Sequence, residues 1–282
     1  MKKYLSLIKF SHTIFAMPFA LIGFFIATKE FGFEWLTLVK VVLCMIFARS
    51  SAMAFNRFID RKFDADNRRT SNREIPNGEI PPRNALIFII INIILLIITT
   101  YFINNLCFLL SPIAIIIILG YSYTKRFTSL CHLILGLGIS LSPIGAYIAV
   151  SNIFDLLPIL FSITVLLWVS GFDIIYSLQD DHFDKSRKLH SIPALLGRRK
   201  AIIISKTLHI LCLIVLTNIG IFYNFSILYW IGLTIFTLLI IYQQLIVNPS
   251  NLDNINIVFF ITNGFASIIF GVFVILDIIY LG

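Results

Sequence analysis

Long apolar runs are the sequence feature that most limits what this chain can fold into. Isoleucine, leucine and phenylalanine fill windows of about 20 residues, the length that an α-helix needs to cross a hydrocarbon core of about 30 Å. Hydrophobic residues make up 59% of the chain, which leaves too little polar surface to coat a soluble globule. The runs are apolar on every face and lack the alternation of barrel strands. The sequence therefore predicts an all-α, polytopic membrane helical bundle.

Nine apolar segments are predicted to cross the membrane. They are residues 12–29, 35–57, 84–103, 106–123, 131–150, 156–179, 201–222, 225–246 and 255–280. We expect them to form a single domain over residues 1–282. Lysines precede the first segment as in a signal peptide, but no small-residue cleavage site follows, so we interpret the segment as the first membrane helix.

Lysine and arginine are concentrated in alternate loops. The loops at 57–83 and 180–200 are rich in both, and Lys125 and Arg126 occupy a third loop, whereas the loops near 104, 152 and 223 have neither. The positive-inside rule places the N-terminus and the three basic loops in the cytoplasm. This distribution explains the net charge of +8 without a nucleic acid partner, and no obligate protein partner is inferred.

Two acidic clusters stand at the ends of apolar segments. In NRFIDRKFD, the residues Asn56, Asp60 and Asp64 recur every four positions and so share one face of a helix. In DIIYSLQDDHFD, Asp180 and Asp184 have the same spacing. A single charged loop is usually only solvated, but two loops with this pattern favour a site. Paired carboxylates near lipid repel each other unless a cation lies between them.

Magnesium is the cation that these clusters fit. Mg²⁺ prefers hard oxygen ligands and is usually held by one or two carboxylates together with substrate phosphates. His182 and His190 form no compact set with the carboxylates, and neither cluster contains cysteine, which disfavours zinc. Carboxylate pairs with Mg²⁺, ringed by Arg and Lys, form a receptor for a diphosphate. The apolar bundle beside it points to an isoprenoid diphosphate, whose allylic C–O bond ionises once the leaving group is stabilised.

The two clusters resemble the motifs of a known family. NRFIDRKFD resembles the NxxxDxxxD signature of the UbiA-type intramembrane prenyltransferases, and DIIYSLQDDHFD resembles their second Asp-rich motif. RTSNREIPNG, YSYTK and LHSIP are similar to further segments of that family, so the resemblance covers nearly the whole chain. It implies the UbiA-type fold of about nine transmembrane helices, in a bacterial inner membrane, with a cavity that faces the cytoplasm. It also implies Mg²⁺-dependent transfer of a prenyl chain to an aromatic acceptor.

The resemblance assigns roles to individual residues. The metal ligands would be Asn56, Asp60, Asp64, Asp180 and Asp184. Lys125 and Tyr121 match residues that contact the diphosphate or the reacting carbon. Phosphate candidates by charge and position alone are Arg61, Arg69, Arg73 and Lys188. Candidates for the remaining substrate contacts are Tyr176, one turn before Asp180; Asp173, which could polarise a phenolic hydroxyl or simply cap a helix; and Arg126, which could pair with a carboxylate or be only interfacial.

Arg57 leaves the acceptor open. In the branch that prenylates 4-hydroxybenzoate, an aspartate usually follows the asparagine of the motif, where this chain has Arg57. The SLQD segment looks closer to a UbiA-like bacterial subgroup, some of whose members are linked to menaquinone. We therefore expect a polyprenyl diphosphate and a small aromatic acceptor, either 4-hydroxybenzoate or a related ubiquinone or menaquinone precursor. The alternatives are a transporter or flippase for a polyprenyl phosphate and, within the family, a haem- or chlorophyll-type prenyltransferase.

Overall fold

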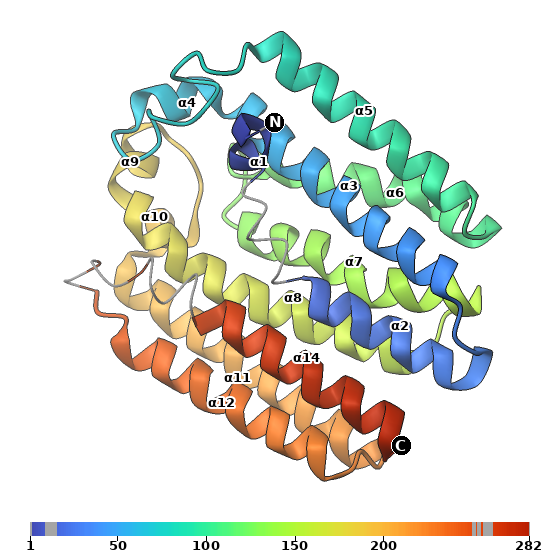
Figure 1. Ribbon diagram of the computed structural model, residues 1–282. Helices are drawn as coiled ribbons and strands as arrows, with labels where there is room; N and C mark the ends of the chain where they lie inside the picture. The colour runs from blue at the N-terminus through green and yellow to red at the C-terminus, as the bar shows by residue number, and fades with distance from the viewer. Residues whose placement is uncertain (1, 9–15, 250–251, 253–254, 256–261, 282) are drawn as a thin grey trace.

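The computed structural model describes residues 2–8, 16–249, 252, 255 and 262–281, and its described elements are mostly long helices (Figure 1). They are α1 (Lys2–Leu7), α2 (Met17–Phe31), α3 (Trp35–Ile59), α4 (Arg61–Asp66), α5 (Pro82–Tyr101), α6 (Asn105–Thr124), α7 (Cys131–Ser151), α8 (Leu156–Ser177), η2 (Leu178–Asp180), α9 (Asp181–Ser186), α10 (Ile192–Leu196), α11 (Arg198–Phe222), α12 (Ile227–Ile246) and α14 (Asn263–Tyr280).

The long helices confirm the predicted membrane bundle. Eight helices among the described residues are long and apolar enough to cross a membrane. The remaining predicted span, 12–29, coincides with α2, although residues 12–15 lie outside the described part of the chain. Residues 256–261 of the last predicted span also lie outside it. The chain is an integral membrane protein.

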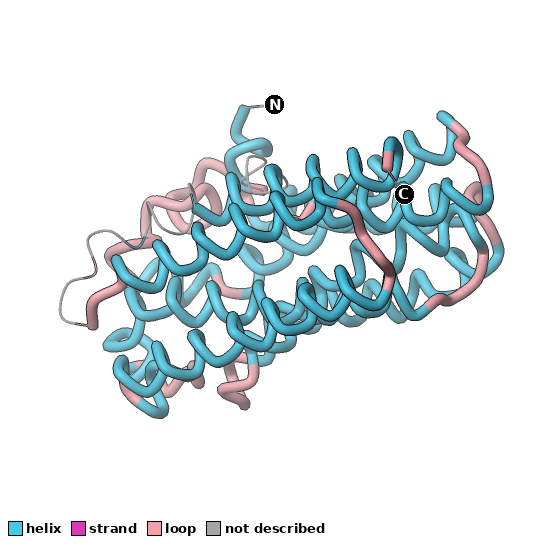
Figure 2. Tube along the Cα trace, turned by 90° about the horizontal axis from the view of Figure 1, so that it is seen from below, coloured by secondary structure: helices cyan, strands magenta, loops and turns pink. Residues whose placement is uncertain are grey.

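Helix α8 lies in the middle of the bundle, between α7 and α11. Helix α2 packs on α7 and on α14, which in turn packs on α12. On the other side, α3 packs against α5, and α6 against α7. Figure 2 shows the same helices running side by side, with connections at both ends of the bundle.

Side-chain caps fix where two of the long helices, α6 and α8, begin. The Asn104 side chain accepts a hydrogen bond from the backbone N of Cys107 at 2.8 Å and so caps α6. The Asp155 side chain caps α8 in the same way, by accepting from the backbone N of Leu157 at 2.9 Å. Each cap satisfies a backbone N–H that the first turn of a helix leaves unpaired. The helices therefore begin directly after short turns.

The largest apolar core lies between α2, α8, α11, α12 and α14. The Trp168 and Phe236 ring centroids are 5.7 Å apart, and those of Phe236 and Phe270 are 5.2 Å apart. Helices α2 and α7 can approach closely because Gly23 has no side chain. A Cβ added at Gly23 would lie 2.0 Å from the carbonyl oxygen of Pro143. Between α3, α6, α7 and α8 the bundle instead encloses a cavity.

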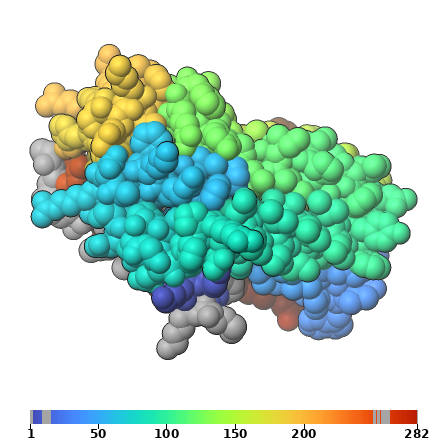
Figure 3. Space-filling model, turned by 90° about the horizontal axis from the view of Figure 1, so that it is seen from above, coloured from blue at the N-terminus to red at the C-terminus, as the bar shows by residue number. Residues whose placement is uncertain are grey.

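The short helices α4, α9 and α10 gather at one end of the bundle (Figure 1). Figure 3 shows residues 60–80, in cyan, lying beside residues 180–200, in yellow, at that end. The bundle therefore brings together the two Asp-rich segments, which are more than a hundred residues apart in the chain.

Candidate active site

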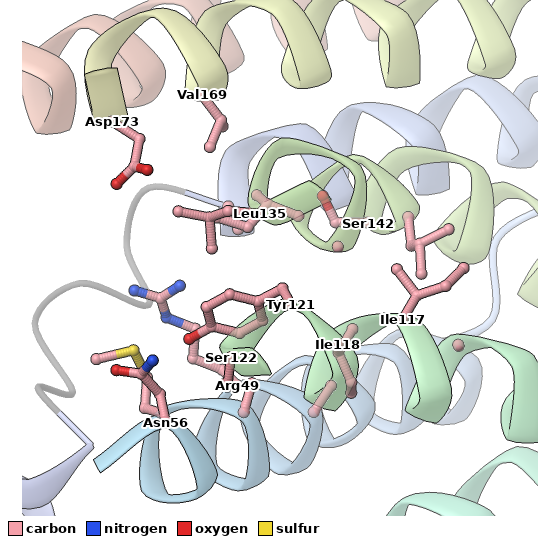
Figure 4. Close-up of a pocket in the computed structure, with 18 of the residues that line it drawn as sticks. Arg49, Asn56, Ile117, Ile118, Tyr121, Ser122, Leu135, Ser142, Val169 and Asp173 are labelled. Atoms are coloured by element: carbon pink, nitrogen blue, oxygen red, sulfur yellow. The ribbon is translucent and has the colours of Figure 1, made fainter. Parts of the chain in front are cut away.

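A cavity of about 1080 Å³ opens between the two Asp-rich segments and continues into the bundle. Its mouth is charged, and its inner part is lined largely by apolar side chains of α3, α6 and α7, several of which Figure 4 shows. On α7 the lining runs from Cys131 to Ala149, which is about 27 Å at a rise of about 1.5 Å per residue. The cavity therefore extends over most of the thickness of a hydrocarbon core.

The first Asp-rich segment forms the predicted polar stripe where α3 ends. Asn56 lies in the last turn of α3, and Asp60 lies between α3 and α4. The Nδ2 of Asn56 donates to Oδ2 of Asp60 at 3.3 Å, and the backbone N of Asp64 donates to the Asp60 carbonyl at 2.8 Å. All three residues line the cavity. The spacing of four residues thus holds across the break between the two helices.

Both carboxylates of this segment pair with arginines. Nη1 of Arg73 lies 2.6 Å from Oδ1 of Asp64, and Nη2 of Arg126 lies 3.2 Å from Oδ1 of Asp60. Arg126 also donates to the carbonyl of Ile59 at 3.0 Å. The other oxygen of Asp64, Oδ2, is buried and has no hydrogen-bond partner among the described residues. A buried carboxylate oxygen of this kind lacks the partner that its charge requires.

The second segment has the same pattern of charge pairs. Nε of Arg69 donates to Oδ1 of Asp180 at 3.0 Å, and Nη2 of Arg69 contacts Oδ2. Nζ of Lys125 lies 2.8 Å from Oδ1 of Asp184, whose Oδ2 accepts from Oγ of Ser191 at 2.9 Å. Asp184 is fully buried, so its charge depends on these contacts.

Lys125 and Arg126 connect the two segments. They follow α6 directly, and Lys125 reaches Asp184 of the second segment while Arg126 reaches Asp60 of the first. Tyr121 lies one turn earlier on α6 and lines the cavity. The end of α6 therefore places cations between the two acidic clusters.

Burial and ion pairing shift the pKa values of two side chains at the mouth, Asp60 and Lys125. Burial raises the pKa of the Asp60 carboxyl above its ordinary value, and the hydrogen bond from Arg126 offsets part of that shift. Burial alone would lower the pKa of Lys125, but the Asp184 carboxylate reverses the effect and the pKa lies above its ordinary value. Lys125 is therefore a fixed cation at neutral pH, suited to bind a phosphate.

The donor set fits Mg²⁺ more closely than other metals. The acidic residues offer hard oxygen atoms, and Asp64 Oδ2 is a buried oxygen with no partner in the described part of the chain. Within the described ranges no three His, Cys, Asp or Glu side chains gather closely enough to hold a metal by themselves. Such an arrangement suits an ion that takes one or two carboxylates and completes its shell with phosphate oxygens.

The other predicted site residues divide into two groups. Asp173 and Tyr176 line the cavity from α8, and Nη1 of Arg69 donates to the Tyr176 hydroxyl at 3.1 Å. Arg61 does not line the cavity; it donates to the Phe58 carbonyl at 2.6 Å. Lys188 is exposed and also lies outside the lining.

Sequence reasoning missed several polar residues of the cavity, among them Arg49, Asn67 and His132. Arg49 lines the inner part of the cavity beside Tyr121 (Figure 4), and its Nε is buried with no hydrogen-bond partner among the residues that the structure describes. Asn67 donates to Oδ1 of Asp180 at 3.1 Å, and His132 contacts Asp173. An arginine inside an apolar span is a signal that could have identified Arg49.

Three comparisons describe what the chain is similar to. Residues 16–265 match the UbiA prenyltransferase family. A 4-hydroxybenzoate octaprenyltransferase from Vesicomyosocius okutanii subsp. Calyptogena okutanii (strain HA) is 32% identical over 222 residues, which cover 78% of this chain and 81% of the relative.

Solved structures share the fold. The apo structure of a UbiA homologue from Aeropyrum pernix K1 has a TM-score of 0.86 and 29% identity, covering 94% of this chain and 98% of the other. A UbiA homologue from Archaeoglobus fulgidus, bound to DMAPP and Mg²⁺, has a TM-score of 0.69 and 22% identity, covering 96% and 99%. These solved proteins therefore have the same arrangement of helices as α2 to α14 of this chain.

Proposed function

This chain belongs to the UbiA prenyltransferase family, and we propose that it transfers a polyprenyl chain from a polyprenyl diphosphate to a small hydroxylated aromatic acid with the help of Mg²⁺. The observation that carries this proposal is the position of the two Asp-rich segments. They meet at the mouth of one long apolar cavity, with lysine and arginine side chains between them.

The charged mouth is the proposed diphosphate site. The residues that would hold Mg²⁺ are Asn56, Asp60, Asp64, Asp180 and Asp184. Bound there, Mg²⁺ would stabilise the negative charge that develops on the leaving diphosphate. The residues that would pair with phosphate oxygens are Arg69, Arg73 and Lys125, which now pair with the carboxylates. Arg61 and Lys188 lie outside the cavity lining and have no role in this proposal.

The inner cavity is the proposed site of the prenyl chain. Its length of about 27 Å along α7 and its apolar lining suit an isoprenoid tail that lies across the membrane. Tyr121 lines the cavity one turn before Lys125 of the mouth, so we place it next to the bond that must break. Its aromatic ring can stabilise positive charge on the allylic carbon. The surrounding apolar side chains exclude water, which would otherwise capture that carbon.

The acceptor would lie between Arg49 and Asp173. Arg49 offers a carboxylate a buried N–H that has no partner within the described ranges, and Asp173 offers an oxygen to a hydroxyl. Arg126, the carboxylate partner expected from the sequence, instead contacts Asp60, so we place it with the diphosphate. The related octaprenyltransferase is named for 4-hydroxybenzoate, which carries both groups.

The distribution of charge supports a placement in the cell. We propose that the chain is a single domain of the bacterial inner membrane, with its N-terminus and both Asp-rich segments in the cytoplasm. Loops at that end carry most of the Lys and Arg, as cytoplasmic loops do. A water-soluble acceptor would enter from this side, where the diphosphate head group of the prenyl donor would also bind.

A panel of acceptors tests the proposal. The purified protein is incubated with Mg²⁺, octaprenyl diphosphate and single aromatic acids, and the products are identified by mass. We expect 4-hydroxybenzoate or a hydroxylated naphthoate to gain one prenyl chain, with release of one diphosphate. Absence of a prenylated product with every hydroxylated aromatic acid would refute the proposal.

A further inference from the structure

His132 is a buried titratable residue to which the proposed reaction gives no role. It lies in the first turn of α7, is 2% exposed and lines the cavity. Its Nδ1 lies 2.7 Å from Oδ2 of Asp173 on α8. Figure 4 shows the carboxylate of Asp173 turned toward the cavity. The histidine therefore holds one oxygen of an acid whose other oxygen faces the substrate space.

The geometry sets the direction of the contact between His132 and Asp173. The backbone N–H of Ile192 faces Nε2 of the ring at 3.3 Å, and Nδ1 faces the carboxylate. A carboxylate only accepts hydrogen bonds, so Nδ1 is the donor to Asp173. The contact thus has one direction, from histidine to carboxylate.

The surrounding structure fixes this pair. Oγ of Ser170 lies 2.6 Å from the carbonyl of Leu166 and 3.2 Å from that of His132, and Ser170 lies on α8 one turn before Asp173, so the first turn of α7 packs directly on this part of α8. Ring and carboxylate are therefore mounted on two turns that are themselves tied together. Orientation by a buried hydrogen-bonded partner is a common way to position an active carboxylate or imidazole.

The segment 190–192 links this pair to the diphosphate mouth. His190 donates its backbone N–H to the carbonyl of Lys125 at 2.7 Å, and Ser191 donates to Asp184 at 2.9 Å. Ile192, the next residue, binds the His132 ring. One short segment thus contacts a phosphate candidate, a metal candidate and the histidine.

We propose that His132 is a positioning residue that turns Asp173 so that its Oδ1 accepts a hydrogen bond from the hydroxyl of the aromatic acceptor. Among the described residues, the hydrogen bond of the Asp173 side chain is made by Oδ2 to His132, which leaves Oδ1 available for this contact. The role rests on the proposed function and narrows it: the acceptor must carry a hydroxyl on the side that faces α8. His132 acts through Asp173 and does not touch the acceptor.

A double-mutant cycle tests this role. His132→Leu removes the donor, Asp173→Ala removes the carboxylate, and the third variant carries both. We expect His132→Leu to lower kcat/KM for the hydroxylated acceptor by about 10- to 100-fold, as loss of a hydrogen bond to a charged group does. The KM for the polyprenyl diphosphate stays unchanged. In the Asp173→Ala background the same change costs nothing further, because the group that it acts through is gone.

Two further variants separate positioning from a merely structural role. His132→Gln keeps an N–H that can reach Asp173, so it recovers part of the loss. His209→Leu is the matched control: His209 is 1% exposed, contacts the carbonyl of Trp168 at 3.2 Å and lies outside the cavity lining. Any fold-change in kcat/KM caused by His209→Leu should multiply with that of Asp173→Ala, because the two residues act independently.

Three results would overturn the role of His132. They are wild-type kinetics in His132→Leu, a loss that multiplies fully with that of Asp173→Ala, and an equal rise in KM for both substrates. A wild-type protein that prenylates no hydroxylated acceptor would instead refute the proposed function on which the role rests. If His132→Leu does not fold, His132→Ala, which also removes the donor, takes its place in the cycle with Asp173→Ala.

Discussion

Arg69 and Asp180 join the two Asp-rich segments across 111 positions of the sequence, with Nε of Arg69 donating to Oδ1 of Asp180 at 3.0 Å and Nη2 contacting Oδ2. A guanidinium presents two parallel N–H groups to a carboxylate, which lysine cannot do. Asn67 donates to the same Oδ1 at 3.1 Å. These contacts hold the two sides of the cavity mouth together.

Arg69→Lys is predicted to weaken diphosphate binding. The variant keeps the charge but loses the paired contact, so Asp180 is no longer held against the first segment. We expect KM for the polyprenyl diphosphate to rise about tenfold, because the arginine is partly exposed and the pair is screened. Arg83→Lys, an exposed arginine outside the cavity lining, serves as control. Identical kinetics in both variants would show that the paired contact of Arg69 with Asp180 has no role in diphosphate binding.

Mg²⁺ is predicted to bind only together with diphosphate oxygens. The carboxylates at the mouth are paired with cations and not gathered into a complete ligand set. Thermal unfolding in detergent checks this. We expect Mg²⁺ and inorganic diphosphate together to raise Tm, because binding adds up to about 2.7 kcal/mol to the free energy of unfolding when the ligand is at 100 times its Kd. Each ligand alone should change Tm little. Asp64→Ala should abolish the shift. A full shift with Mg²⁺ alone would contradict the expectation.

Arg49→Met is predicted to discriminate between acceptors. If Arg49 binds the carboxylate, the variant loses about 10- to 100-fold in kcat/KM for aromatic acids. It should lose little for a phenol that lacks the carboxylate. Lys40→Met is the control on the same helix, because Nζ of Lys40 donates to the Phe102 carbonyl at 2.8 Å and lies outside the cavity lining. Equal losses for both acceptor types would remove Arg49 from the acceptor site.

Gly145→Leu is predicted to shorten the prenyl chain that the enzyme accepts. Gly145 lines the inner cavity, and a Cβ added there meets no atom within 4 Å, so a leucine would project into open space. We expect turnover of short prenyl diphosphates to persist and that of octaprenyl diphosphate to fall. Gly120→Leu, also unobstructed but outside the cavity lining, should not change the preference. Competition between two chain lengths, read by product mass, measures the ratio.

The membrane spans and the Asp-rich stripe could be predicted because they depend on local periodicity. Residues four apart on a helix share a face, and Asn56 and Asp60 are indeed hydrogen-bonded. The partners of these acids could not be predicted. Arg126 binds Asp60 because α6 ends beside α3, a relationship of tertiary packing.

His132 shows the same limit more clearly. In the sequence it is a lone histidine at the start of an apolar run, and nothing local connects it to Asp173. The contact exists because α7 packs along α8 and places the two side chains within 2.7 Å. Arg49 differs, since a charge inside an apolar span is itself a signal of function.

We propose that the two Asp-rich segments form one site for Mg²⁺ and diphosphate. The most direct test compares Asp60→Ala and Asp180→Ala, one from each segment, in a single assay of diphosphate release and prenylated product. Asp66→Ala is the control, since Asp66 is 49% exposed, pairs with Arg187 and does not line the cavity. We predict that both site variants lose at least about 100-fold in rate, whereas Asp66→Ala keeps wild-type activity. Wild-type product formation in either site variant, or movement of the lipid between leaflets without bond cleavage, would contradict the claim.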